Sequence, residues 1–227
     1  MALFPLLRCE RRPTAELSTK ERDALLALAS EVAPGLPSAY LLQRFARYEQ
    51  VWIARRAERV AGFLLVHELT TPETALVYIG PAFSSGGAYA HAFAALVRER
   101  LRASEPFLIA MEVENPSVWR MLARIVPSHL FPRADVTTHQ AAVLRRLARA
   151  ALARVPHVID FDPVSMTSAI PVASASSSAV TRYKVLLVSC DGSLEARASI
   201  ARELTRGLSS LRAGRTCSAG AWERSDG

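Results

Sequence analysis

Hydrophobic positions near the start of the chain recur with the spacing of a helix. Residues 14–28 place their apolar side chains on one side, and Ser18 with Glu21 forms the Ser-x-x-Glu pattern of a capping box. Residues 39–48 repeat the helical spacing after a break rich in Pro and Gly, with Ser38 as the expected N-cap. The pattern therefore predicts two helices at the start of the chain.

The pattern then changes to runs of β-branched and aromatic residues, which are typical of strands. Residues 50–54 and 60–69 flank a polar turn and predict a hairpin, and residues 75–79 predict a third strand. Residues 80–88 form a loop of mostly small residues, and residues 89–103 return to helical spacing. An antiparallel run of strands is thus expected to lead through a loop into a helix.

The next strand is expected in the middle of a sheet. Residues 107–113 are apolar on both faces up to Glu112, and Asn115 is the expected N-cap of a helix over residues 117–125. Antiparallel strands followed by a strand–helix–strand crossover predict an α/β (α+β) fold. Its sheet should be mixed and mostly antiparallel, with helices on both faces.

The last third of the chain has a weaker pattern. A helix is expected over residues 138–155, an irregular segment over residues 156–171 and a flexible link over residues 174–178. A strand over residues 183–189 and a helix over residues 194–208 follow.

These elements divide the chain into three parts. A core is expected over residues 1–126, a C-terminal α/β extension over residues 127–208, and a disordered tail over residues 209–227. Residues 183–208 would add a strand and a helix to the main body or to a partner subunit, so a homodimer is one open arrangement. A separate nucleotide-binding βα unit is a further alternative, although its turn lacks the glycines that such a unit needs.

Composition excludes some classes of protein. The 227 residues are 50% hydrophobic, which supports a core, and the net charge of +7 comes almost entirely from Arg. Because the basic residues form no cluster with interleaved aromatics, nucleic acid is not an expected partner. Cys9, Cys190 and Cys217 show no metal-ligand spacing, so no metal is expected, and no apolar run reaches the ~18 residues of a membrane span. We expect a cytoplasmic protein.

The order of elements over residues 14–126 resembles that of the GNAT superfamily of acyl-CoA-dependent N-acyltransferases. The segments YIGPAFSSGGAYAHAF and MEVENPSVWRMLAR carry the resemblance, together with the strand order. It implies a GNAT-like core that binds acetyl-CoA or another acyl-CoA as substrate. It further implies that the pantetheine arm lies near Ile79, between two strands that part.

The loop before the helix would hold the CoA pyrophosphate on backbone N–H groups, as helix N-termini hold anions. Gly87 matches the first required glycine of the family's loop, whereas Ser84 stands in place of the usual Arg or Gln. A flexible turn without a ligand is the alternative. The implied positions are Ser84, Ser85, Gly86, Gly87, Ala88 and Tyr89.

The second segment keeps Asn115 but has Leu122 where the family often has an acidic Tyr. The candidate general bases are Glu112 and, as a rival, Glu68, and Tyr78 is a candidate replacement acid. Strand-end charges reaching solvent and a core tyrosine are the structural alternatives. The resemblance thus predicts transfer of an acyl group, acetyl in the first instance, to a small-molecule or peptide amine. A catalytically inactive GNAT-like domain that binds a ligand or a protein is the alternative.

Overall fold

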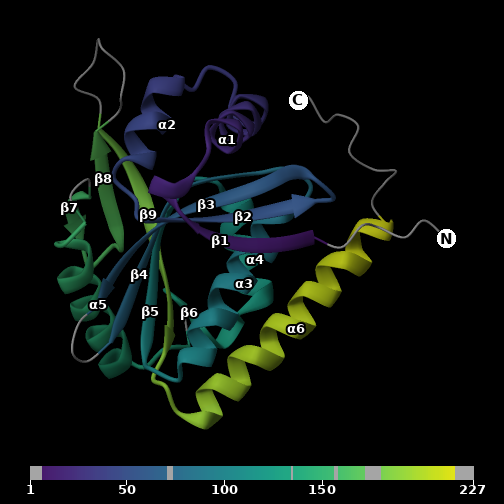
Figure 1. The fold of residues 1–227 in the computed structure, drawn as a ribbon. Helices are drawn as coiled ribbons and strands as arrows, with labels where there is room; N and C mark the ends of the chain where they lie inside the picture. Colours follow the sequence, from purple (N-terminus) through teal and green to yellow (C-terminus); the bar gives the residue numbers. More distant parts are fainter. Residues whose placement is uncertain (1–6, 71–73, 134, 156–157, 172–179, 218–227) are drawn as a thin grey trace, which may run out of the picture.

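A computed structural model describes residues 7–70, 74–133, 135–155, 158–171 and 180–217. They form one mixed sheet in the order β1-β2-β3-β4-β5-β9-β8-β7, with β6 beside β9 (Figure 1). The strands are β1 Leu7–Pro13, β2 Gln50–Arg56, β3 Arg59–Thr70, β4 Ala75–Ser84, β5 Phe107–Val113, β6 Leu130–Phe131, β7 Ile159–Asp162, β8 Thr167–Pro171 and β9 Val180–Cys190. The helices are α1 Thr19–Val32, α2 Ser38–Phe45, α3 Ala88–Ala103, α4 Pro116–Ile125, α5 Thr138–Leu152 and α6 Leu194–Cys217, with 3-10 turns at Thr14–Glu16 and Pro127–His129.

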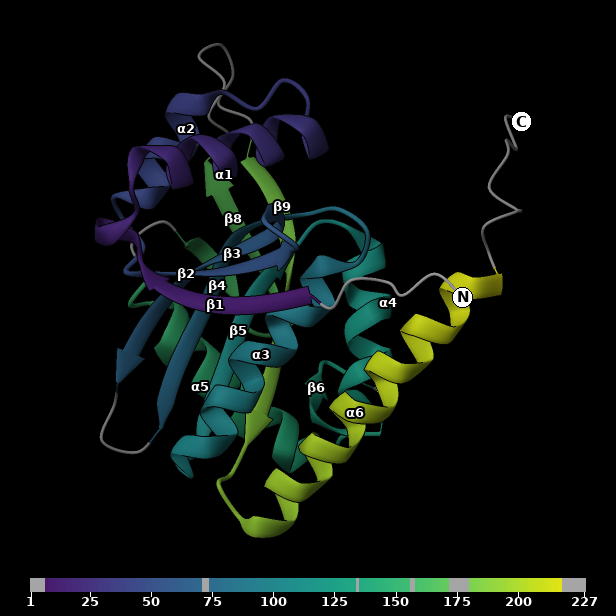
Figure 2. The same cartoon turned by 45° about the vertical axis from the view of Figure 1, so that its right-hand side comes forward.

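Helices cover both faces of the sheet, which confirms the predicted fold class. One buried cluster joins α3, α4 and α6 to alternate strand residues such as Leu64 and Val66. The other joins α1, α2 and α5 to the strand residues that alternate with these, such as Phe63 and Leu65. Figures 1 and 2 show the two groups of helices on opposite sides of the sheet. The two clusters follow from the period-2 alternation of side chains along each strand.

The strand predicted over residues 183–189 lies inside the main sheet. β9 pairs antiparallel with β5 from Phe107↔Cys190 to Val113↔Lys184, and it pairs with β8 on its other side. Of the placements left open by the sequence, addition to the main body is therefore the one observed. The alternative of a separate nucleotide-binding unit is wrong, because β9 and α6 pack into the same sheet and core.

Several predicted elements have different bounds in the structure. β1 and the β7–β8 hairpin were not expected: β1 is rich in Arg, and the hairpin falls in the segment expected to be irregular. The loop expected at residues 80–88 begins later, since β4 continues to Ser84 along β3. Helix α6 continues to Cys217, so the tail is not disordered before that residue. The expected link over residues 174–178 lies outside the described residues.

Two of the three N-cap residues predicted from the sequence cap their helices in the structure. The Ser18–Glu21 capping box is present at α1, and the Asn115 side chain accepts a hydrogen bond from the Ser117 N–H at α4. Ser38 is not a cap, because α2 begins one residue earlier than expected and Pro37, which lacks a capping side chain, takes the N-cap position.

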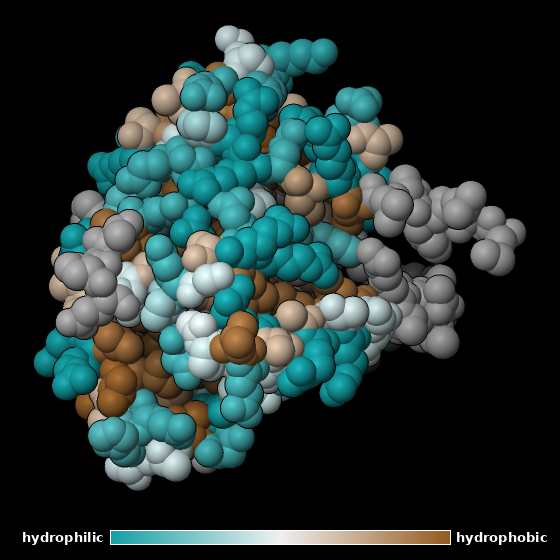
Figure 3. Space-filling model, turned by 60° about the horizontal axis from the view of Figure 1, so that its bottom comes forward, coloured by the Kyte–Doolittle hydropathy of each residue, from teal (hydrophilic) through white to brown (hydrophobic). Residues whose placement is uncertain are grey.

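None of the described helices combines the length and hydropathy needed to cross a membrane. On the face turned toward the reader in Figure 3, hydrophilic residues cover most of the surface, and hydrophobic residues appear in separate patches.

Candidate functional site

The two central parallel strands part beyond one pair of residues. β4 and β5 pair from Ala75↔Phe107 to Ile79↔Met111, and no further pair joins them. β4 then shifts register and follows β3 alone, while β5 continues along β9. Beyond Ile79, the edge of β4 that faces β5 is thus left without a strand partner among the described residues. The sequence resemblance implied such a parting at this place.

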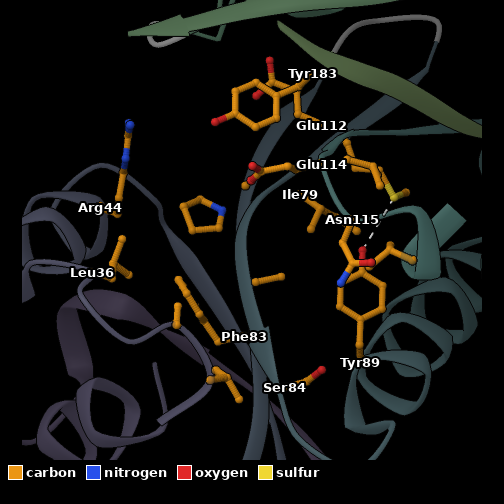
Figure 4. A pocket seen from close by; sticks show the side chains of 18 of the residues that line it. Leu36, Arg44, Ile79, Phe83, Ser84, Tyr89, Glu112, Glu114, Asn115 and Tyr183 are labelled. Carbon is orange, nitrogen blue, oxygen red and sulfur yellow. Dashed lines mark hydrogen bonds between the residues drawn. The ribbon is translucent and has the colours of Figure 1, made fainter. Parts of the chain in front are cut away.

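A cleft of ≈ 860 Å³ opens where the strands part. Its walls come from the ends of β4 and β5, from the segment joining α1 to α2, from α2, and from the starts of α3 and α4. Tyr183 of β9 also lines it, so the C-terminal part of the chain contributes to the same cleft. Figure 4 shows Arg44 and Leu36 on one side of this space and Glu114 and Asn115 on the other.

Gly80 marks the place where β4 turns away from β5. A Cβ atom added there would lie 2.1 Å from the Tyr48 hydroxyl oxygen, far closer than any real contact. Any larger residue would push Tyr48 or the strand out of place, so glycine lets the tyrosine pack directly on the backbone at the opening of the cleft.

The N-terminus of α3 meets one end of the cleft. Gly87 occupies the N-cap in a left-handed conformation (φ 79°), and no side chain caps this end. The Ser85 N–H donates to the Ala61 carbonyl at 2.8 Å, and the Ala88 N–H donates to the Ser85 carbonyl at 3.1 Å. Those two N–H groups are therefore unavailable to a ligand, which corrects the expectation that all amides from Ser85 to Tyr89 hold an anion. The Ser85 N–H is used because the pairing of β3 with β4 extends one residue into the loop, and the Ala88 N–H is used by a turn that ends at α3.

A guanidinium group from another element reaches this loop. Arg56, at the end of β2, places Nη2 3.5 Å from the Gly86 carbonyl oxygen, and a Cβ atom on Gly86 would lie 3.1 Å from the same nitrogen. Ser84 is uncharged, so the cation at this loop comes from Arg56 of β2. No local sequence pattern identifies Arg56, because it precedes Gly86 by 30 positions.

Glu112 lies in a network of hydroxyl groups. Tyr78 donates a hydrogen bond to one carboxylate oxygen, and Ser168 of β8 donates to the other. The Tyr48 hydroxyl is hydrogen-bonded in turn to that of Tyr78. Burial raises the pKa of Glu112 even though both hydrogen bonds and the nearby Arg44 act to lower it. The pKa of Tyr78 is raised as well, first by burial and then by the adjacent Glu112.

The rival base, Glu68, lies elsewhere. Its Oε1 atom forms ion pairs with the Nη2 atoms of Arg11 and Arg100, each at 3.1 Å, on the α3 side of the sheet. Since its neighbours in β3 alternate between the two faces, Glu68 faces away from the side on which Glu112 lies, and it does not line the cleft. The structure therefore brings only one of the two candidate carboxylates into the cleft with Tyr78.

The remaining predicted residues lie around the same opening. Ile79, Ser84, Tyr89 and Asn115 line the cleft (Figure 4). The hydroxyl of Tyr89, in the first turn of α3, donates to the sulfur of Met111 in β5 at 3.6 Å. The other loop residues, Ser85, Gly86, Gly87 and Ala88, connect Ser84 to Tyr89 without lining the cleft. Leu122 is fully buried in the core, so it offers no group to a ligand.

No family model matches the sequence, and no curated protein matches it. Among solved structures, the chain is similar to the aminoglycoside N-acetyltransferase AAC(6')-Iy in complex with CoA, at 12% identity and a TM-score of 0.39, over 60% of this chain and 95% of that one. It is also similar to a ribosomal-protein-alanine N-acetyltransferase from Brucella melitensis, at 13% identity and a TM-score of 0.43, over 59% and 96%. A probable N-acyltransferase from Enterococcus faecalis aligns at 12% identity and a TM-score of 0.40 over 52% of this chain, which spans only 32% of that protein. Since these TM-scores lie below 0.5, what the cleft can do follows from its own geometry.

Proposed function

We propose that this protein is an acyltransferase that moves an acyl group, acetyl in the first instance, from acyl-CoA to an amine. The observation that carries the proposal is the parting of β4 and β5 beyond Ile79 and Met111, which opens the cleft beside Glu112. An extended arm can add itself to the unpaired edge of β4 as a further strand does, through backbone hydrogen bonds.

The pyrophosphate of CoA would lie at the start of α3. The N–H groups of Gly87 and Tyr89 have no hydrogen-bond partner in the described part of the chain, and the helix dipole favours an anion there. The guanidinium of Arg56 beside Gly86 adds a charge-assisted contact. In this binding mode the pyrophosphate contacts fewer backbone N–H groups than the sequence predicted. The guanidinium of Arg56 takes the place of the Ser85 and Ala88 N–H groups.

Glu112 is the proposed general base. Its raised pKa makes it a stronger proton acceptor than an exposed carboxylate, and it lines the cleft. The neutral amine attacks the thioester carbonyl carbon, so that a C–N bond forms and the C–S bond breaks. Glu112 takes the proton that the amine loses. Tyr78, which donates a hydrogen bond to Glu112, is the proposed proton donor to the departing thiolate, and it recovers a proton from Glu112 along that hydrogen bond. The products are an amide and free CoA, and holding both reactants in one cleft supplies much of the rate.

An inactive domain that only binds a ligand is the second candidate. Two observations favour it: the Ser85 and Ala88 amides are already engaged, and Leu122 is buried where an acid is expected. Binding of acetyl-CoA without release of free thiol in the presence of any amine would select this candidate over the enzyme.

Titration calorimetry with acetyl-CoA tests the binding mode. Arg56→Gln should weaken acetyl-CoA about 10-fold, because a charge-assisted hydrogen bond of ~1.5 kcal/mol is lost. Arg59→Gln is the matched control: it removes the same charge from the same hairpin at an exposed position, and it should leave the affinity within about 2-fold. Absence of any heat with wild-type protein at millimolar acetyl-CoA would end the proposal.

A further inference from the structure

A buried cation without an ion-pair partner lines the cleft. Arg44 of α2 is only 8% exposed, and its Nη1 atom has no hydrogen-bond partner in the described part of the chain. None of the ion pairs among the described residues involves it. It lies over the ring of Tyr40, whose centroid is 4.8 Å from the guanidinium carbon. Figure 4 shows it on the wall of the cleft opposite Glu114 and Asn115.

A buried guanidinium whose N–H groups lack acceptors destabilises the folded protein, and buried charges are almost always paired. A cation–π contact offsets part of that cost but accepts no hydrogen bond. Glu112 is close enough to interact with Arg44 through space, but its two oxygens already accept from Tyr78 and Ser168. An acceptor for the guanidinium is thus missing on the side where the cleft opens.

We infer that Arg44 binds a carboxylate carried by the acceptor amine, so that the acceptor is an amino carboxylic acid. This inference rests on the proposed function and specifies its substrate class. A guanidinium presents paired N–H donors in a plane that matches a carboxylate. The amine end is then held beside Glu112 and the acid end beside Arg44, because both residues line one cleft.

The rest of the cleft fits a compact apolar side chain carried by such an acceptor. Leu36, Tyr40, Phe83 and Tyr183 line it and present mostly carbon surface. A polyamine would instead bring additional positive charge next to Arg44, at a cost that rises as water is excluded. The cleft therefore selects a zwitterionic acceptor over a polycationic one.

Matched pairs of acceptors test the inference with the full chain and acetyl-CoA. The probes are phenylalanine against 2-phenylethylamine and leucine against isoamylamine, which differ in the carboxylate, and spermidine as a carboxylate-free polycation. Release of free thiol gives kcat/KM for each. At least one amino acid should exceed its carboxylate-free partner by 10-fold or more, and spermidine should be the poorest acceptor.

Variants separate substrate binding from an indirect role through Glu112. Arg44→Gln should lower kcat/KM for the preferred amino acid about 100-fold and change that of its carboxylate-free partner by less than about 3-fold, while Arg44→Lys recovers part of the loss. Arg47→Gln, an exposed arginine just beyond the same helix, is the control and should change neither rate. Thermal unfolding of each variant checks that it folds.

Three results would overturn the inference. Equal rates on both members of every pair would do so, even if acetyl-CoA binds, and the proposed function would then stand alone. An equal fall on both members in Arg44→Gln would assign Arg44 to tuning Glu112 instead of binding substrate. Failure of wild-type protein to bind acetyl-CoA would remove the proposed function and this inference together, and calorimetry without any acceptor detects that case separately.

Discussion

Replacing Glu112 with glutamine should remove activity and yet not weaken the fold at neutral pH. The amide has the same shape as the carboxylate, and the hydroxyls of Tyr78 and Ser168 can each donate to it or accept from it. Converting two charge-assisted hydrogen bonds into neutral ones costs ~1 kcal/mol each, so ~2 kcal/mol would be lost if those bonds were the whole effect. The charge on Glu112 is also partly buried, and removing it recovers its desolvation penalty.

The direction of the pKa shift decides which effect wins. Hydrogen bonds to Tyr78 and Ser168 lower the pKa of Glu112, burial raises it, and the net pKa is raised. Ionised Glu112 is therefore less stable in the folded chain than in the unfolded one. Below its unfolded pKa the carboxyl is protonated in both states, so this cost is absent. It develops as pH rises through the folded pKa, and Glu112→Gln abolishes it.

Urea unfolding at pH 4 and pH 7 measures this balance. The difference in unfolding free energy between Glu112→Gln and wild type should shift in favour of the variant as the pH rises from 4 to 7. Glu114→Gln, an exposed carboxylate in the same cleft, should change stability by less than ~0.5 kcal/mol at both pH values. At the same time kcat should fall about 10²- to 10⁴-fold in Glu112→Gln. A variant ~2 kcal/mol less stable than wild type at pH 7, or one with unchanged kcat, would refute the reasoning.

Two further predictions concern the fold. Ser18→Ala should lower the unfolding free energy by ~1 kcal/mol because it removes the α1 capping box, whereas Ser38→Ala, which removes no cap, should change it by less than ~0.5 kcal/mol; equal effects in urea titrations would contradict this. Gly207→Ala should destabilise the protein although Ala is the better helix former by ~1 kcal/mol, because its Cβ would lie 2.5 Å from the Ile125 Cα; a raised melting temperature would show that α6 does not pack so closely on α4.

Elements with a local physical cause could be predicted from the sequence. The capping box at Ser18 and the cap at Asn115 satisfy backbone donors within a few residues, so their pattern is complete in a short window. The strand over residues 107–113 was predicted with its observed bounds, because a run that is apolar on both faces must be covered on both. Glu112 and Tyr78 were both candidates, but their hydrogen bond was not foreseen.

The parts that were missed depend on contacts between distant segments. Arg44, Arg56 and Ser168 carry no motif, and each acquires its place in or beside the cleft only when the sheet is assembled. β1 lacks the hydrophobic run of an ordinary strand because it is an edge strand with charged side chains. The insertion of β9 between β5 and β8 is a pairing over long sequence separation, and hydrophobic periodicity does not specify a partner.

A crystal structure of the protein soaked with acetyl-CoA tests the central claim most directly. The account predicts density for the pantetheine arm along the free edge of β4 beyond Ile79, and for the pyrophosphate at the N–H groups of Gly87 and Tyr89 with Arg56 beside it. Crystals in which the cleft between β4 and β5 stays empty at saturating acetyl-CoA, or in which CoA binds at another surface, would contradict it.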